Sequence, residues 1–277
     1  MKTKFILCIC LLVTVVVVQA QDYRWELGLN IYPNLYWKYN KLEYNMNGIK
    51  AVAPDYPNGV AIGVTVQRQL NNGWGIATGL EYSKQSQKFV SSGGRFFATD
   101  TGETFYSFNE FSKLNIAYVS LPIQVTYNLP INQSDGWYLY TKQGINVSYL
   151  VNYNSMINSY NGDGSFFSSL KHSYGGIIQY QSDVNQDFYR DGDTAYKYFA
   201  LGYTGNMGIK KRLSNRTSVQ GAIRFDYDFT NADNVSGLYN RTTNGMNYFT
   251  DWYNMDNRPA SHNMRIGLEV GVSYQLD

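Results

Sequence analysis

The stretch that precedes the final residue of this chain alternates in polarity. The residues at every second position are apolar: Met264, Ile266, Leu268, Val270, Val272, Tyr274 and Leu276. The residues between them are glycine, polar or charged. A period of two indicates a β-strand whose two faces meet different surroundings. Soluble strands usually have about five or six residues. A strand that crosses a membrane needs about ten, and it must belong to a closed barrel because lipid offers no partner to a free backbone edge. The alternation therefore predicts a transmembrane strand.

The N-terminal segment predicts export. Lys2 and Lys4 precede an apolar run over residues 5–18, and Val18-Gln19-Ala20 offers a small-residue cleavage site. We expect residues 1–20 to be a signal peptide and residues 21–277 to form one barrel domain. An uncleaved membrane anchor is the alternative, but the run is shorter than the roughly twenty residues of a spanning helix. Cleavage would remove Cys8 and Cys10, which excludes a disulfide or a thiolate metal site from the mature chain.

The composition agrees with a barrel. Aromatic residues make up 16% of the chain, with 26 Tyr and 25 Gly, and the apolar residues are spread along it. Removing Lys2 and Lys4 from 23 basic residues leaves 21, which equals the 21 acidic residues, so the expected mature chain has no net charge. This balance argues against nucleic acid as a partner.

Eight segments of the chain alternate in this way. They lie at residues 23–31, 59–70, 74–82, 117–127, 137–151, 199–209, 219–229 and 264–276, and Thr141 and Gln143 interrupt the apolar face of the fifth. The fold class that we predict is all-β: an eight-stranded, antiparallel, up-and-down transmembrane β-barrel.

The connections between these segments alternate in length. Short connections are expected at residues 71–73, 130–136 and 214–216, and long ones at 32–58, 89–113, 152–197 and 230–260. Outer-membrane barrels have short periplasmic turns and long extracellular loops, and aromatic girdles at both interfaces, where Trp74 and Trp137 would lie. A soluble two-sheet sandwich is the competing fold. It explains neither the strand lengths nor the asymmetry of the loops.

Two of these segments resemble a known family. The strand Tyr118-Val119-Ser120-Leu121-Pro122-Ile123-Gln124-Val125-Thr126-Tyr127 and the following residues 137–150 are similar to strands of PorT-like outer-membrane β-barrel proteins of Bacteroidetes. The C-terminal pattern Glu269-x-Gly271-x-x-Tyr274-x-Leu276 resembles the assembly signal that the barrel-insertion machinery reads. The resemblance implies a multi-pass protein of the bacterial outer membrane. It does not imply a single activity, although one relative works in type IX protein secretion.

The inward faces of the predicted strands carry equal numbers of positive and negative residues. We expect a paired ionic network that fills the lumen, because isolated buried charges are costly and eight strands enclose little more than their own side chains. An ion or proton path is the alternative. The predicted network contains Arg24, Glu26, Glu81, Lys142, Lys210, Arg224, Asp226, Asp228, Arg265 and Glu269.

Pro122 lies in the middle of a predicted strand, where its missing N–H removes a ladder hydrogen bond. A local bulge at Pro122 is the expected solution, and a gating hinge is the alternative.

Enzyme chemistry is disfavoured. Only His172 and His262 could activate a serine nucleophile, and neighbours on a strand such as Ser261 and His262 point to opposite faces. We expect no catalytic residue, no cofactor and no metal site. The segment Asn161-Gly-Asp163-Gly-Ser165 begins like a calcium loop but has His172 in the position of the bidentate acid.

The longest loop is rich in aromatic residues, which suit contact with a partner because tyrosine gives a large contact area at low entropic cost. The candidate contact residues are Tyr160, Phe166, Phe167, Tyr174 and Tyr189. They could equally pack on one another above the barrel. We predict a non-enzymatic structural or binding platform whose partners are outer-membrane lipid, the barrel-insertion machinery and another envelope protein or a glycan. The alternatives are a small or gated pore, an accessory role in protein secretion or assembly and, least favoured, a lipid-modifying enzyme.

Overall fold

The computed structural model describes residues 24–40, 55–70, 73–99, 102–132, 134–161, 166–173, 178–182, 197–230, 232 and 261–276. Of these, residues 38–40, 55–57, 89–99, 102–112, 155–161, 166–173, 178–182 and 261 are described by their backbone alone. The expected signal peptide lies outside the described residues. The described elements are the strands β1 (Trp25–Asn40), β2 (Asp55–Gln69), β3 (Trp74–Thr99), β4 (Gly102–Asn132), β5 (Trp137–Asn161), β6 (Phe166–Ser173), β7 (Ile178–Ser182), β8 (Phe199–Arg212), β9 (Thr217–Asp228) and β10 (Ser261–Leu276).

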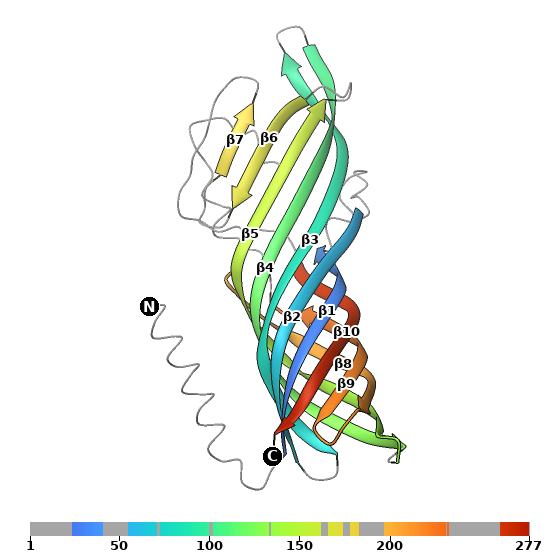
Figure 1. Ribbon diagram of the computed structural model, residues 1–277. Helices are drawn as coiled ribbons and strands as arrows, with labels where there is room; N and C mark the ends of the chain where they lie inside the picture. The colour runs from blue at the N-terminus through green and yellow to red at the C-terminus, as the bar shows by residue number, and fades with distance from the viewer. Residues whose placement is uncertain are drawn as a thin grey trace, which may run out of the picture.

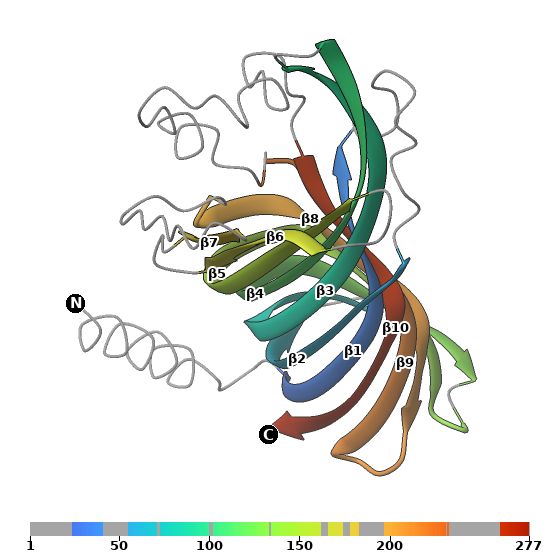
Figure 2. The same cartoon turned by 90° about the horizontal axis from the view of Figure 1, so that it is seen from above.

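Eight of these strands close into an antiparallel barrel. The sheet runs β4-β3-β2-β1-β10-β9-β8-β5, and the pairing of β4 with β5 closes it. The first and last strands meet along a long ladder that runs from Trp25 opposite Leu276 to Asn40 opposite Ser261. The ring is visible when the molecule is seen from above (Figure 2). The predicted up-and-down barrel is therefore confirmed.

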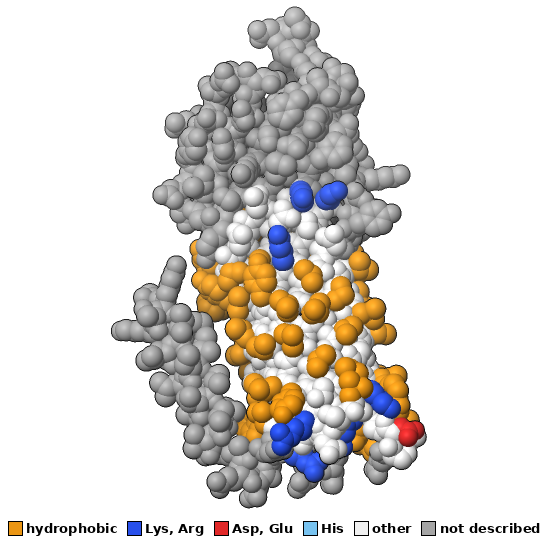
Figure 3. Space-filling model, in the orientation of Figure 1, with side chains coloured by type: hydrophobic (Ala, Val, Ile, Leu, Met, Phe, Trp, Pro, Cys, Tyr) orange, Lys and Arg blue, Asp and Glu red, His pale blue; other side chains and the backbone are white. Residues whose placement is uncertain are grey.

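The alternation of the sequence becomes an alternation between lipid-facing and inward-facing side chains. On β9, for example, Ile223 and Phe225 are exposed while Arg224 and Asp226 are buried. Exposed apolar side chains from all eight barrel strands form a band around the middle of the barrel, with Lys and Arg side chains beyond it at both ends (Figure 3). Such a band is the surface that a barrel presents to hydrocarbon.

Tight turns close one end of the barrel. Gly73 and Gly136 adopt φ values of 82° and 68°, in the left-handed region that favours glycine. The turn between β8 and β9 is held by the Ser214 hydroxyl, which accepts the N–H groups of Arg216 and Thr217 at 3.3 and 3.0 Å. The short connections expected at 71–73 and 214–216 lie where the sequence predicts them, whereas β4 continues to Asn132 and shortens the connection expected at 130–136.

The opposite end differs from the expected long loops. The expected loop at 89–113 is a hairpin in which β3 and β4 stay paired up to Thr99 opposite Gly102. The expected loop at 152–197 begins as a continuation of β5 and contains the additional strands β6 and β7. The chain thus has ten described strands, although eight form the barrel. These segments could not be predicted from the alternation, because strands beyond the membrane need no apolar face.

These segments form a sheet that rises beyond the barrel (Figure 1). We name it the projecting sheet: residues 89–99 of β3, 102–112 of β4 and 155–161 of β5, together with β6 and β7. It continues the barrel wall in the order β3-β4-β5-β6-β7.

The bulge expected at Pro122 is not there. Pro122 pairs with Asn146 of β5 between two regular pairs, and the register of β3 against β4 is the same on both sides of it. The Thr78 hydroxyl donates to the Pro122 carbonyl at 2.9 Å. A side chain of β3 therefore hydrogen-bonds to β4 at the residue that has no N–H for the ladder. The strand tolerates proline without an inserted residue.

The orientation of the barrel can be tested by labelling. A chain from residue 21 onward contains no cysteine, so an impermeant maleimide on intact cells reports single replacements. Asp163→Cys, between β5 and β6, should react, and Asn72→Cys, in the β2–β3 turn, should react only after the cells are permeabilised. Reaction of Asn72→Cys but not of Asp163→Cys on intact cells would show that the barrel has the opposite orientation.

Candidate functional site

The lumen of the barrel contains nine of the ten predicted interior charges. Glu26, Glu81, Lys142, Lys210, Arg224, Asp226, Asp228, Arg265 and Glu269 are all buried. Arg24 is the exception, and the prediction was wrong for this residue. Arg24 is exposed. It stands one residue before β1 begins, at the end of the barrel, where a side chain on the inward side still reaches solvent. Among the residues that the structure describes, the lumen therefore holds four positive and five negative residues rather than five of each.

Arg224 of β9 is the centre of the network. Its guanidinium contacts Glu81 of β3 through both terminal nitrogens, including a hydrogen bond of 3.2 Å from Nη2 to Oε1. It also donates to Asp226 at 3.1 Å and to Glu269 of β10 at 3.3 Å. The ring of Tyr32 lies 4.6 Å from the guanidinium carbon. One cation thus ties together β1, β3, β9 and β10 across the lumen.

Arg265 of β10 shares two of these acids. Its Nη1 donates to Glu81 at 3.4 Å, and its Nη2 lies 3.0 Å from Asp226 Oδ2 without the geometry of a hydrogen bond. Glu269 also accepts the amide of Asn206 at 3.0 Å. A carboxylate that accepts several charge-assisted bonds is held firmly, so this layer crosslinks opposite walls of the barrel.

A second ion pair lies nearer to the short turns. Lys210 of β8 binds both carboxylate oxygens of Glu26 of β1, with 2.6 Å from Nζ to Oε2. A chain of amides fills the space between the two layers of charge: Gln220 donates to Asn30 at 2.7 Å, and Asn30 donates to Thr65 at 3.2 Å.

Lys142 is also buried in the lumen, but its environment differs from that of the paired cations Lys210, Arg224 and Arg265. Within the described part of the chain it forms no ion pair, and its Nζ lies 5.6 Å from the centre of the Tyr140 ring. It lines a cavity of about 20 Å³ together with Gln124, Arg224 and Glu269. This space holds about one water molecule.

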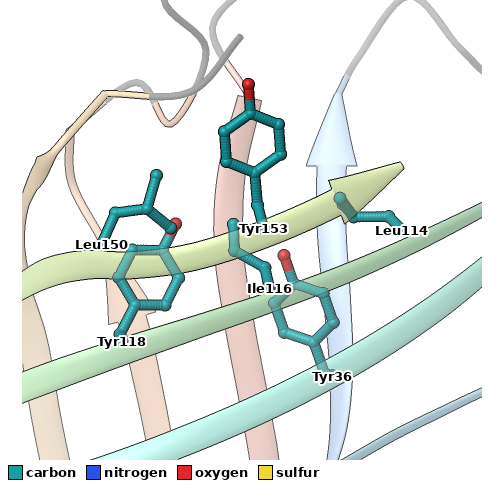
Figure 4. Packing of buried hydrophobic residues seen from close by; sticks show 6 residues of the cluster. All are labelled: Tyr36, Leu114, Ile116, Tyr118, Leu150 and Tyr153. Carbon is teal, nitrogen blue, oxygen red and sulfur yellow. The ribbon is translucent and has the colours of Figure 1, made fainter. Parts of the chain in front are cut away.

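An apolar plug occupies part of the lumen above the charges. Six buried residues pack together here: Tyr36, Leu114, Ile116, Tyr118, Leu150 and Tyr153 (Figure 4). The Tyr36 hydroxyl donates to Asn263 at 2.7 Å, which in turn donates to Asp228 at 2.7 Å. The plug therefore also anchors the uppermost buried carboxylate, which has no cation among its hydrogen-bond partners in the described residues.

A β-bulge places Tyr153 in this plug. Ala117 pairs with Asn152 and Tyr118 pairs with Leu150, so Val151 is an extra residue on β5. One extra residue reverses the facing of every later side chain, which turns the odd-numbered Tyr153 inward. The sequence analysis missed the plug because it began the fourth strand at residue 117 and ended the fifth at 151.

The structure describes the side chain of His262, whereas His172 is described by its backbone alone. His262 Nδ1 lies 2.9 Å from the backbone oxygen of Asp228, and its ring stacks on Tyr227 at 5.5 Å between centroids. His172 pairs with Ile178 in the backbone ladder of β6 and β7. Among the described residues, no group of three or more His, Cys, Asp or Glu could hold a metal ion.

The candidate contact residues have a less complete description. Tyr160 and Phe166 are paired in the β5–β6 ladder, and Phe167 follows in β6. Tyr174 and Tyr189 lie outside the described residues. The structure thus brings Tyr160 and Phe166 together in the projecting sheet and does not test the rest of the prediction.

Comparison with known proteins decides the class. The model of a family described as outer membrane protein beta-barrel domain matches residues 19–234, which is most of the chain. The chain belongs to this family. The protein is therefore a β-barrel of the bacterial outer membrane. A comparison with curated proteins finds no match.

Several solved structures have a similar arrangement of strands at low identity. OprG from Pseudomonas aeruginosa is 10% identical with a TM-score of 0.40, and the match covers 92% of this chain and 96% of OprG. Neisserial surface protein A is 9% identical with a TM-score of 0.34, covering 91% and 97% of the two chains. The attachment invasion locus protein Ail of Yersinia pestis is 9% identical with a TM-score of 0.34, covering 92% and 100%.

The network predicts the effect of removing its central cation. Arg224→Ala should lower the free energy of unfolding by about 3–5 kcal/mol, because it leaves Glu81, Asp226 and Glu269 buried with less compensation. Urea unfolding of the barrel in lipid vesicles measures this. Adding Glu81→Gln to Arg224→Ala should recover part of the loss, since it removes one stranded charge.

The matched control is Lys84→Ala, which removes an exposed cation of β3 and should change the stability by less than about 0.5 kcal/mol. Equal stabilities of Arg224→Ala and the unchanged protein would mean that the network does not hold the barrel together.

Proposed function

We propose that this protein is a non-enzymatic binding platform, which the barrel anchors in the outer membrane and whose projecting sheet meets a partner outside the cell. The observation that carries the proposal is the contrast between the two parts of the molecule. The lumen is filled by the ion pairs of Arg224 and Lys210 and by the apolar plug. The wall of β3, β4 and β5 nevertheless continues far beyond the plug.

The length of this extension supports the proposal. Strand β3 runs on for eleven residues after Lys88 and stays paired with β4 throughout. At about 3.3 Å per residue this is roughly 35 Å of strand. Membrane insertion alone does not require such an element. Rigid scaffolds that display variable contact residues are a common way to build a binding surface.

A finer assignment to the PorT-like proteins of Bacteroidetes is supported by the sequence pattern at 118–127, which is a regular part of β4 in the barrel wall. An accessory role in secretion or assembly is compatible with a platform that binds another envelope protein. A solute pore is disfavoured, since the cavity beside Lys142 holds about one water molecule. Catalysis is disfavoured because the described His262 faces a backbone carbonyl.

The proposal predicts that binding and folding can be separated. Replacing residues 155–196 by a tight turn should leave membrane insertion and heat-resistant migration unchanged, because connections outside the membrane tolerate large changes. The same deletion should abolish capture of the envelope protein or glycan that crosslinks to the unchanged protein on intact cells. The His172→Ala and His262→Ala variants should capture the partner normally.

Capture by the deletion variant would place the binding surface outside residues 155–196, on the β3–β4 hairpin, the barrel wall or the short turns. Loss of a lipid-modifying activity in either histidine variant would contradict the non-enzymatic assignment.

A further inference from the structure

The lipid-facing wall formed by β5 and β8 contains a cluster of polar side chains. Gln143 and Thr141 of β5 and Tyr203 of β8 all face outward, and Gln143 is exposed. These positions interrupt an otherwise apolar band, in which the neighbouring outward residues include Ile145, Leu201 and Met207.

The cluster lies at the middle of the membrane. On β5 the exposed Trp137 stands six residues below Gln143 and the exposed Tyr149 stands six residues above it. Lys211 lies 4.5 Å from the centre of the Trp137 ring, and Tyr149 packs against Phe199 at 5.0 Å, so both positions have the character of interfacial girdles. With a strand tilt of about 40°, six residues raise the chain by about 15 Å, and the apolar band of such barrels is about 25 Å tall.

The polar groups are joined in a chain of hydrogen bonds. The Tyr203 hydroxyl donates to the Gln143 amide oxygen, the Gln143 amide donates to the Thr141 hydroxyl at 2.8 Å, and that hydroxyl donates to the Asn206 carbonyl at 2.8 Å. The amide also approaches the Asn206 carbonyl at 3.5 Å, the longest of these contacts. The Gln143 amide therefore retains a weakly bound N–H and an accepting oxygen beside each other on the outer surface.

Lipid cannot complete these bonds, because acyl chains have no hydrogen-bonding groups and a polar side chain in the bilayer is costly. Polar side chains at such depths commonly join transmembrane segments to one another. A protein surface is therefore a better neighbour than lipid for the weakly bound N–H of the Gln143 amide.

A second copy of this chain is the occupant that the chemistry favours. A primary amide carries a donor and an acceptor side by side, so two amides related by a two-fold axis can form a reciprocal pair. A two-fold interface requires this kind of self-complementary patch. Gly205 lies beneath the cluster, and a Cβ at this position would meet the Tyr203 hydroxyl and the Gln143 amide oxygen. The glycine lets the polar groups lie flat on the wall, where a second wall can approach.

We propose that the β5–β8 wall is an interface between two copies of this protein within the membrane, with the two Gln143 amides paired at its centre. The apolar residues around the cluster pack against their counterparts, and Met207 adds an adaptable contact. This interface goes beyond the proposed binding role and does not depend on it.

Disulfide crosslinking tests the geometry. Gln143→Cys in residues 21–277, which contain no other cysteine, places two thiols at the proposed two-fold axis. The matched control is Ile31→Cys, an exposed position on the opposite wall that also lies six residues above a tryptophan, Trp25. In phospholipid vesicles treated with copper phenanthroline, Gln143→Cys should give about tenfold more covalent dimer than Ile31→Cys. Equal yields, or no dimer from Gln143→Cys, would overturn the proposal.

Association without a crosslink tests the role of the amide. Single-molecule photobleaching in the same vesicles should show dimers of the unchanged protein, and Gln143→Leu should raise the dimer dissociation constant about tenfold. Gln143→Asn should keep most of the affinity, and heat-resistant migration confirms that each variant is folded. A monomeric unchanged protein, or a Gln143→Leu variant that dimerises equally well, would show that lipid or another protein covers this wall.

Discussion

An unpaired backbone amide or carbonyl cannot face hydrocarbon, and this constraint determines the rest of the molecule. It forces the strands into a closed ring, which the pairing of β1 with β10 and of β4 with β5 completes. With eight strands the interior is only wide enough for side chains. The inward positions must therefore be filled, and in this chain they are filled by charges that neutralise one another around Arg224.

The barrel was predictable because lipid imposes a simple rule on every second residue. The alternation at residues 264–276 and 219–229 predicted β10 and β9 closely, and nine of the ten charges that it placed in the interior are buried there. The alternation is no longer required where a strand extends beyond the membrane. The hairpin beyond Lys88, the strands β6 and β7 and the inward turn of Tyr153 after the bulge at Val151 depend on pairing between distant segments, which no local pattern records. The prediction failed at Arg24 because this residue keeps the alternation of the sequence but lies one residue before β1 begins.

Departures from the alternation carry the functional information. Thr141 and Gln143 break the apolar face of β5, and the structure joins them to Tyr203 in one cluster at mid-membrane. The aromatic segment at 152–197 lacked the alternation, and its residues 155–161, 166–173 and 178–182 belong to the projecting sheet. In both places lipid contact alone does not account for the residue types present, and only the fold shows which of these residues lie together.

The central claim is that the lumen is closed, so that the protein acts by its outer surfaces. The most direct measurement is the conductance of the purified barrel in planar bilayers. The Arg224 layer and the plug of Tyr36, Ile116 and Tyr153 predict the absence of steady, porin-like channels. Stable, ion-selective channels from the unchanged protein would contradict the account and would favour transport through the barrel instead.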